Sequence, residues 1–242
     1  MSGGRPESAA LPVAETVLLL VRHAEQRTMR LPDAELSQRG QRQAGLLAQR
    51  LARLPLSAVV ASPLRRARQT AAAIGAATGL EVEVEDGLEE VHLTPEERER
   101  RYTQSAARAM EPEDGDGAYA RTALAMVRVL PRTRWAEDRG TESMESLRSR
   151  GVAAVERVLA RHHGGAVACV SHGGLINAVL GAWTGASADL WFVPWHTGIS
   201  TVLARGDERI LIGLNDASHL AAAEEPLDLV TRSVRRPPSS SS

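Results

Sequence analysis

Short aliphatic runs alternate with helix-like periodicities along most of the chain, and this alternation restricts the fold more than any other feature. Buried or half-buried strands are expected at 16–21, 58–61, 81–85 and 166–170, and helices at 36–54, 62–79, about 141–162 and 174–183. Two last strands, 199–204 and 209–214, flank RGDE as a hairpin. Strands that alternate with helices at this spacing predict right-handed crossovers. We therefore expect an α/β fold of three α/β/α layers around a mostly parallel sheet.

The helix at 62–79 carries its own start and stop signals. Ser62 suits the N-cap, Pro63 the first helical position and Gly79 the residue that ends the helix.

The ends of the chain and one internal stretch depart from the alternating pattern. Residues 1–14 and 221–242 are rich in small residues, proline and serine, and we expect both to be disordered tails around a single domain at 15–220. The stretch 91–135 is charged and glycine-bearing, and it is expected to be a cap insertion over one end of the sheet.

Charge and cysteine content exclude several classes of function. The 242 residues have a formal net charge of -1, which argues against a nucleic-acid partner. All 29 basic residues are arginine, so no mechanism can use a lysine amine. The single cysteine, Cys169, lies in the apolar run AVACV and is expected to be a buried hydrophobe in a reducing compartment. No signal segment or membrane-length apolar run is present, so we expect a soluble, cytoplasmic protein with no membrane partner.

Four aromatic residues fall within 13 positions near the C-terminal part of the domain: Trp183, Trp191, Phe192 and Trp195. Such clusters are usually core under a loop. A contact in a homodimer or a wall of the substrate pocket is the alternative.

Polar side chains capable of chemistry follow each predicted parallel strand. The residues at these junctions are Arg22 and His23, Arg65 and Arg66, Glu89 and Glu90, and His172. The carboxyl ends of parallel strands meet at one edge of a sheet, where ligands bind. Arginines, histidines and helix N-termini gathered in one small volume would bind a multiply charged anion, above all phosphate.

The same residues stand in segments that resemble those of the histidine phosphatase (phosphoglycerate mutase-like) superfamily. LLLVRHAEQ is similar to its Arg-His-Gly signature, LSQRGQRQA to its Leu-Thr-x-x-Gly-x-x-Gln-Ala segment and SPLRRARQTA to its Ser-x-Leu-x-Arg-Ala-x-Gln-Thr segment. VSHGG and LNDASHL match its later segments, and the order is the same over residues 16–220. The resemblance implies a phosphoglycerate mutase-like fold.

The resemblance also implies how the residues would work. His23 would be the nucleophile and would form a phosphohistidine; it must be neutral to attack, and nearby arginines favour that form of a group whose ordinary pKa is about 6.5. Arg22, Arg66 and His172 would bind the phosphoryl oxygens, with the alignment selecting Arg66 over its neighbour Arg65. Gly173 would offer its backbone N–H to the phosphate.

A leaving alkoxide needs a proton, which the family takes from a carboxylic acid after the third strand. GLEEV offers Glu89 and Glu90, and the family's Leu-x-Glu spacing favours Glu90. The implied enzyme is a metal-independent phosphatase with no cofactor, acting on a small-molecule phosphate ester. His162, His163, His196 and His219 show no metal-like spacing, and His219 is expected to be structural.

The sequence departs from the family at several positions. Ala24 replaces the signature glycine, and Gln26 and Met29 stand where many members have Thr or Ser and a phosphate-binding Asn. VHLTPEER lacks both the Gly-x-Trp-Glu-Gly segment of many sugar-phosphate phosphatases and the longer segment of true mutases. A phosphatase of open substrate is therefore favoured. The alternatives are a phosphoglycerate mutase, a protein-phosphohistidine phosphatase or, outside enzymes, a phosphate-ligand binding or regulatory module.

Overall fold

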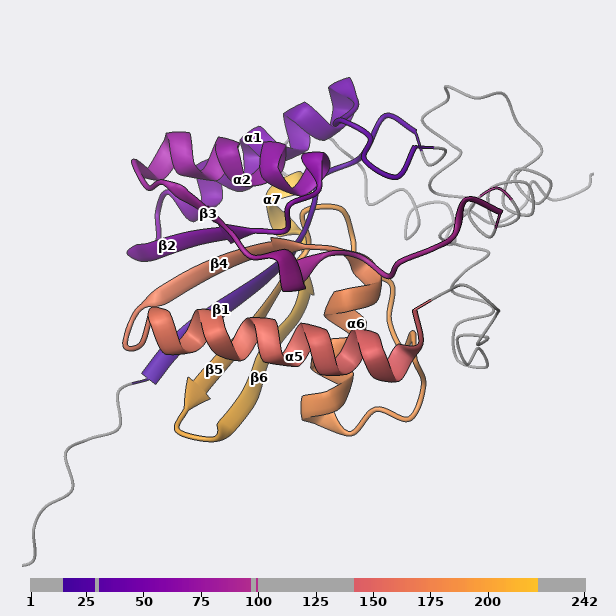
Figure 1. Ribbon diagram of the computed structural model, residues 1–242. Coiled ribbons are helices and arrows are strands. Elements are labelled where there is room, and N and C mark those ends of the chain that lie inside the picture. The colour runs from indigo at the N-terminus through magenta and orange to yellow at the C-terminus, as the bar shows by residue number, and fades with distance from the viewer. Residues whose placement is uncertain (1–14, 29–30, 97–98, 100–141, 222–242) are drawn as a thin grey trace, which may run out of the picture.

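A six-stranded, mostly parallel sheet forms the centre of the molecule (Figure 1), as the alternation of strands and helices predicts. The computed structural model describes residues 15–28, 31–96, 99 and 142–221, so both expected tails and most of the expected cap insertion lie outside the described residues. The strands are β1 (Glu15–Arg22), β2 (Leu56–Ala61), β3 (Val82–Val84), β4 (Ala166–Ser171), β5 (Ile199–Arg205) and β6 (Glu208–Asp216).

The strand order is β3-β2-β4-β1-β5-β6. The first four strands in this order are parallel to one another. β5 pairs antiparallel with β1, and β6 pairs antiparallel with β5 as the expected hairpin. This order places β4 and β1 side by side at the centre, so the residues that follow them are neighbours in space.

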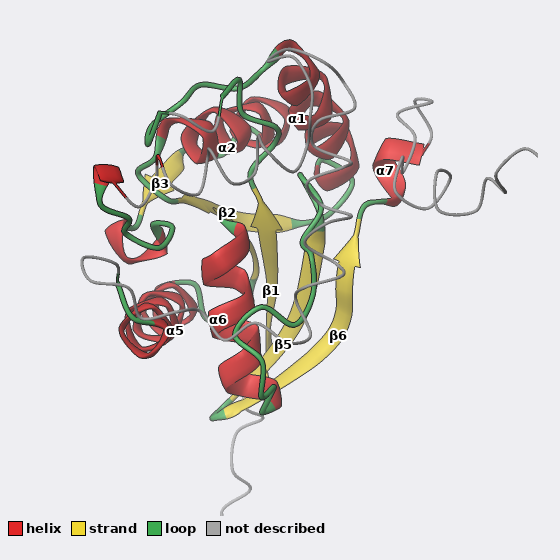
Figure 2. Cartoon of the chain, turned by 90° about the vertical axis from the view of Figure 1, so that its right-hand side faces the viewer, coloured by secondary structure: helices red, strands yellow, loops and turns green. Residues whose placement is uncertain are grey.

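Helices cover both faces of the sheet (Figures 1 and 2). On one face lie α1 (Gln38–Leu51), α2 (Arg65–Thr78) and the short α7 (Ser218–Ala221), and on the other α5 (Met144–Arg161) and α6 (Gly173–Thr184). The 3-10 turn η1 (Asp86–Leu88) follows β3. Of the helices described, none is both long and apolar enough to cross a membrane.

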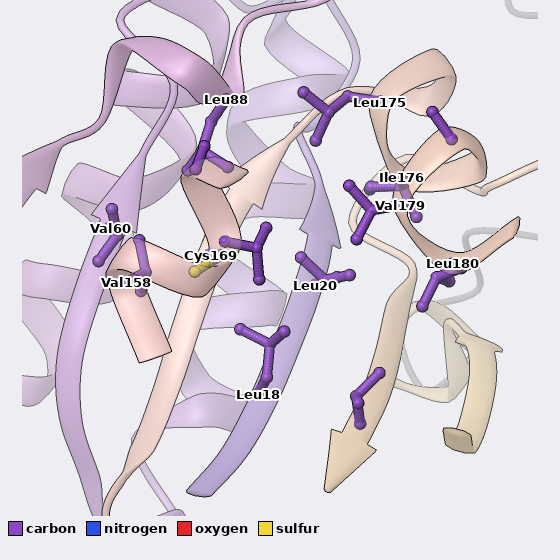
Figure 3. Close-up of a cluster of buried hydrophobic side chains, with 14 of the residues drawn as sticks. Leu18, Leu20, Val60, Leu88, Val158, Cys169, Leu175, Ile176, Val179 and Leu180 are labelled. Carbon is purple, nitrogen blue, oxygen red and sulfur yellow. The ribbon is translucent and has the colours of Figure 1, made fainter. Parts of the chain in front are cut away.

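Two buried clusters fill the layers because successive strand residues point to opposite faces. Leu18 and Leu20 of β1 pack against α5 and α6, whereas Leu19 and Val21 pack against α1 and α2. Figure 3 shows the first cluster, which includes Cys169. Burial raises the pKa of the Cys169 thiol to about 12, and the prediction of a buried apolar cysteine is confirmed.

The aromatic residues also contribute to the first cluster. Trp183 of α6 and Trp191 and Phe192 of the following loop are partly buried against it. The side-chain oxygen of Asn177 fixes this loop by accepting hydrogen bonds from the N–H groups of Trp191 and Phe192. The interpretation of these three side chains as core under a loop is confirmed.

The expected helix at 62–79 begins two residues later than its start signals indicate. Ser62 directly follows β2 and continues its pairing with β4, because its N–H donates to the carbonyl of Val170. α2 begins at Arg65 with Leu64 as its N-cap. The prediction of Ser62 as N-cap is wrong, because its hydroxyl contacts His172 instead. The predicted stop is confirmed, since Gly79 takes the left-handed conformation with φ of 75°.

Candidate active site

The ends of the three central parallel strands bring the predicted site residues together. Arg22 at the end of β1 is paired in register with Ser171 at the end of β4, so His23 and His172 each lie one position beyond this pair. The N–H of His23 donates to the carbonyl of Ser171 over 2.9 Å. Ser62 follows the neighbouring strand β2 in the same way. The site is therefore assembled by sheet register, as the strand-end rule predicts.

The tautomer of His23 follows from its hydrogen bonds. Its Nδ1 lies 2.7 Å from the carbonyl oxygen of Ala24, and a carbonyl only accepts, so Nδ1 carries the proton. Nε2 then keeps its lone pair and accepts from Nε of Arg66 over 3.2 Å. Burial, and next the charges of Arg66 and Arg22, hold the pKa of His23 well below its usual value. The ring is a neutral imidazole with its basic nitrogen directed toward a guanidinium.

His172 lies beside this ring and is fully buried. The centroids of the two imidazoles are 5.0 Å apart. Its Nε2 lies 2.7 Å from the hydroxyl of Ser62, while its Nδ1 has no hydrogen-bond partner among the described residues. Burial, followed by the charge of Arg66, lowers the pKa of His172 well below its usual value. A buried nitrogen without a partner is uncommon in a folded protein and is typical of a ligand site.

Two arginines supply the positive charge. Arg66 is buried, and besides its bond to His23 it donates from Nη1 to the carbonyl of Pro32 over 2.8 Å. Arg22 donates from Nη1 to the carbonyl of Pro194 over 2.7 Å. A Cβ added to Gly173 would lie 3.7 Å from Nε of Arg22, so this glycine packs against the guanidinium. Arg65, by contrast, is a surface cation paired with Glu35.

The two candidate proton donors lie in different surroundings. Glu90 reaches the start of α6, where its Oε2 accepts from the N–H of Gly174 over 3.2 Å. Glu89 points to the surface and pairs with the exposed His92, its Oε2 lying 2.8 Å from Nε2 of that residue. Of the two carboxylates, Glu90 is therefore the one that lies at the N-terminus of α6, where His172 is the N-cap residue.

Arg150 of α5 holds the segment that carries Glu90. Its Nη1 donates to the carbonyls of Gly87 and Glu89 over 2.9 and 3.0 Å, and its guanidinium is paired with the buried carboxylate of Glu142. The position of Glu90 is thus fixed by main-chain contacts on one side and by the N-terminus of α6 on the other.

A third buried histidine, His196, lies in the site and was missed by the sequence analysis. Its ring centroid is 5.6 Å from that of His23. It precedes β5, which runs antiparallel to β1 and pairs Ile199 with Val21, so the residues before β5 lie at the same edge of the sheet as His23. No sequence signal marks His196, because it belongs to no motif and precedes an antiparallel strand, which the rule for parallel strand ends does not cover.

Together these residues form a cluster suited to a phosphoryl group, because two guanidiniums and neutral imidazoles lie at one edge of the sheet. The described residues contain no group of three or more His, Cys, Asp and Glu side chains arranged to hold a metal ion.

Known proteins are similar to this chain in sequence and in fold. The model of the histidine phosphatase superfamily (branch 1) matches residues 18–217. The chain is 31% identical to phosphoserine phosphatase 1 of Hydrogenobacter thermophilus over 223 residues, which covers 84% of this chain and 93% of that protein. It resembles a mycobacterial glucosyl-3-phosphoglycerate phosphatase, solved with inorganic phosphate, at 28% identity and a TM-score of 0.63, covering 84% of this chain and 98% of that one.

A phosphoglycerate mutase from Bacillus anthracis shares the fold, with 17% identity, a TM-score of 0.64 and coverage of 86% of this chain and 96% of that one. The matched region includes every site residue predicted from the sequence. The chain therefore belongs to the histidine phosphatase superfamily (branch 1) and is a phosphoric monoester hydrolase.

Proposed function

We propose that the protein hydrolyses a small phosphomonoester, without a metal ion, through a phosphohistidine intermediate on His23. The observation that carries this proposal is the tautomer of His23: Nδ1 is held as a donor by the Ala24 carbonyl, which leaves the lone pair on Nε2. A neutral imidazole with a fixed, buried lone pair beside two guanidiniums is an activated nucleophile for a phosphoryl group.

In the first step, Nε2 of His23 attacks phosphorus in line with the leaving oxygen. The P–N bond forms, the P–O bond to the leaving group breaks, and that oxygen takes a proton from the protonated carboxyl of Glu90. In the second step, a water attacks phosphorus while the Glu90 carboxylate accepts its proton. The P–N bond breaks, and inorganic phosphate leaves with His23 restored.

The remaining residues stabilise charge on the phosphoryl oxygens, which is the main catalytic task in such a transfer. Arg66 donates to the attacking nitrogen of His23 in the present structure. A bound phosphoryl group would draw this guanidinium onto its own oxygens and so release the lone pair for attack. Arg22 and the N–H of Gly173 bind further oxygens. We assign the Ser62 hydroxyl as the donor to Nε2 of His172. The imidazole proton then lies on Nδ1, which has no partner among the described residues and can donate to the phosphoryl group.

Among substrates, we place L-phosphoserine first. Its support is the 31% identity to a protein named for phosphoserine hydrolysis, over most of both chains. A phosphorylated glyceric acid derivative comes next, because of the mycobacterial relative. Both are small phosphate esters that carry a carboxylate.

The test is hydrolysis of p-nitrophenyl phosphate and of a phosphate-ester panel in EDTA, by the wild type, His23→Ala and His163→Ala. His163 is exposed at the end of α5 and serves as the matched control. We expect turnover in the wild type and the control, and a loss of at least about a thousandfold in His23→Ala, as for removal of other nucleophiles. Rapid quenching with 32P-labelled phosphoserine should trap an acid-labile, base-stable phosphoenzyme.

Turnover that survives in His23→Ala would exclude the phosphohistidine mechanism. A wild type inactive on the whole panel would leave the chain as a phosphate-ligand binding or regulatory module.

A further inference from the structure

The loop before β5 holds His196 close to the nucleophile by main-chain contacts. The N–H of Thr197 donates to the carbonyl of Arg22 over 2.9 Å, and the N–H of Arg22 donates to the carbonyl of Gly198 over 3.1 Å. These two bonds tie the loop to the last residue of β1. The position of His196 is therefore set relative to His23 by the backbone.

The conformation of this loop is strained. Thr197 is fully buried and has a φ of 59°, a region that a β-branched residue rarely adopts. Its hydroxyl lies 2.6 Å from the carbonyl of His196 and 2.9 Å from Nε2 of His219, which fixes it from both sides. Asn215 accepts from the N–H of Trp195 over 2.7 Å. Strain that several contacts maintain is concentrated at functional sites.

The surroundings of His196 favour an anion. His196 is 5% exposed. Besides the neighbouring imidazole of His23, the groups that act on its charge are the guanidiniums of Arg22, Arg39 and Arg66, from three different parts of the chain. Burial, and then Arg22, hold the pKa of His196 well below its usual value, so the ring is neutral. A neutral imidazole keeps one N–H donor, and an anion is the natural partner for a donor placed among cations.

The placement of His196 is comparable with that of His172. Their ring centroids lie 5.6 and 5.0 Å from that of His23, respectively. A phosphoryl group on His23 would thus have an imidazole from β4 and another from the loop before β5 at similar range. Only the first of them is expected from the family's motifs.

We propose that His196 is a further phosphoryl-binding residue, which donates a hydrogen bond to an oxygen of the group bound at His23. The proposal rests on the proposed function of the same site. It implies that the loop at 195–198 is part of the catalytic machinery and that its strain serves to place one donor.

The experiment compares His196→Phe, His196→Gln and the wild type, with His163→Phe as the same substitution at an exposed histidine. Inorganic phosphate is the probe, measured as a competitive inhibitor of p-nitrophenyl phosphate hydrolysis and directly by calorimetry. Phe keeps a ring but no donor, and Gln keeps an N–H. We expect phosphate to bind His196→Phe about tenfold more weakly, the loss of one charge-assisted hydrogen bond, and His196→Gln to recover part of this.

Imidazole 15N spectra of the wild type during a phosphate titration give a second test that needs no folded Phe variant. The His196 nitrogens, assigned by their loss in His196→Gln, should shift on binding. Unmoved His196 signals, or a His196→Phe variant that binds phosphate and turns over like the wild type, would overturn the inference. Failure of the proposed function is a separate result, in which the wild type itself neither binds phosphate nor hydrolyses the esters.

Discussion

At the scale of single residues, the proposed mechanism makes the protonation state of His23 the control of activity on the acid side of the pH profile. Its pKa lies well below the usual value because of burial and the charges of Arg66 and Arg22. A lowered pKa means that more acid is needed to protonate the nucleophile, so the active neutral form persists below pH of about 6.5.

We therefore expect kcat to remain flat from pH 7 to below about 6.5 and to fall only in more acidic solution. The measurement is kcat at saturating p-nitrophenyl phosphate across pH 4 to 8. Repeating it in deuterated buffer and with a second ester controls for changes in the rate-limiting step. An acid limb centred at or above the ordinary histidine pKa would contradict a buried, desolvated nucleophile.

The residues that sequence alone located are those that follow parallel strands. Arg22, His23, Arg66 and His172 lie together because parallel strands end at one edge, a rule that requires only the strands and their order. His196 follows a long connection and precedes an antiparallel strand, so this rule does not reach it. Ser62 illustrates a second limit. The Ser-Pro pattern is typical of a helix start, but the Ser62 hydroxyl forms a hydrogen bond with His172, and Leu64 is the N-cap.

At the scale of elements, α5 holds the segment that carries Glu90, the proposed proton donor, through Arg150. Replacing it by Met removes the bonds to the carbonyls of Gly87 and Glu89 and leaves the buried Glu142 carboxylate unpaired. We expect a loss of unfolding free energy of about 2 kcal/mol. We also expect kcat for an alkyl phosphate to fall by about tenfold, because Glu90 is no longer held in place.

The size of the effect should depend on the leaving group. p-Nitrophenolate leaves without help from an acid, so p-nitrophenyl phosphate should lose less activity than phosphoserine. Arg157→Met is the matched control, because Arg157 lies on the same helix and pairs with Glu85, away from Glu90. Equal losses for both esters would place Arg150 in a purely structural role.

The elements themselves were largely predictable, since hydrophobic periodicity reports which faces are buried. The hairpin of β5 and β6 was expected, but its antiparallel pairing with β1 depends on the contacts of whole strands, which periodicity does not contain. The expected tails and most of the cap insertion lie outside the residues that the structure describes, and those predictions stay open.

At the scale of the whole molecule, the homodimer that the aromatic cluster offered as an alternative stays untested. The aromatic side chains that suggested it include three that pack against the chain's own core. Size-exclusion chromatography with light scattering would measure the mass of the assembly directly, and the mass of a single chain, 26.0 kDa, would refute the dimer.

The in-register pairing of β1 and β4 has a consequence for heat inactivation. His23 and His172 extend one residue beyond the paired residues Arg22 and Ser171, so their separation is a property of the sheet itself. Central strands open last in a folded protein. Warming should therefore not loosen the pair gradually: phosphatase activity and the far-ultraviolet circular dichroism signal should disappear at the same temperature. Activity lost well before the strands melt would locate the weak point in the loop that carries His196. The enzyme should therefore keep its activity up to the temperature at which its central strands unfold.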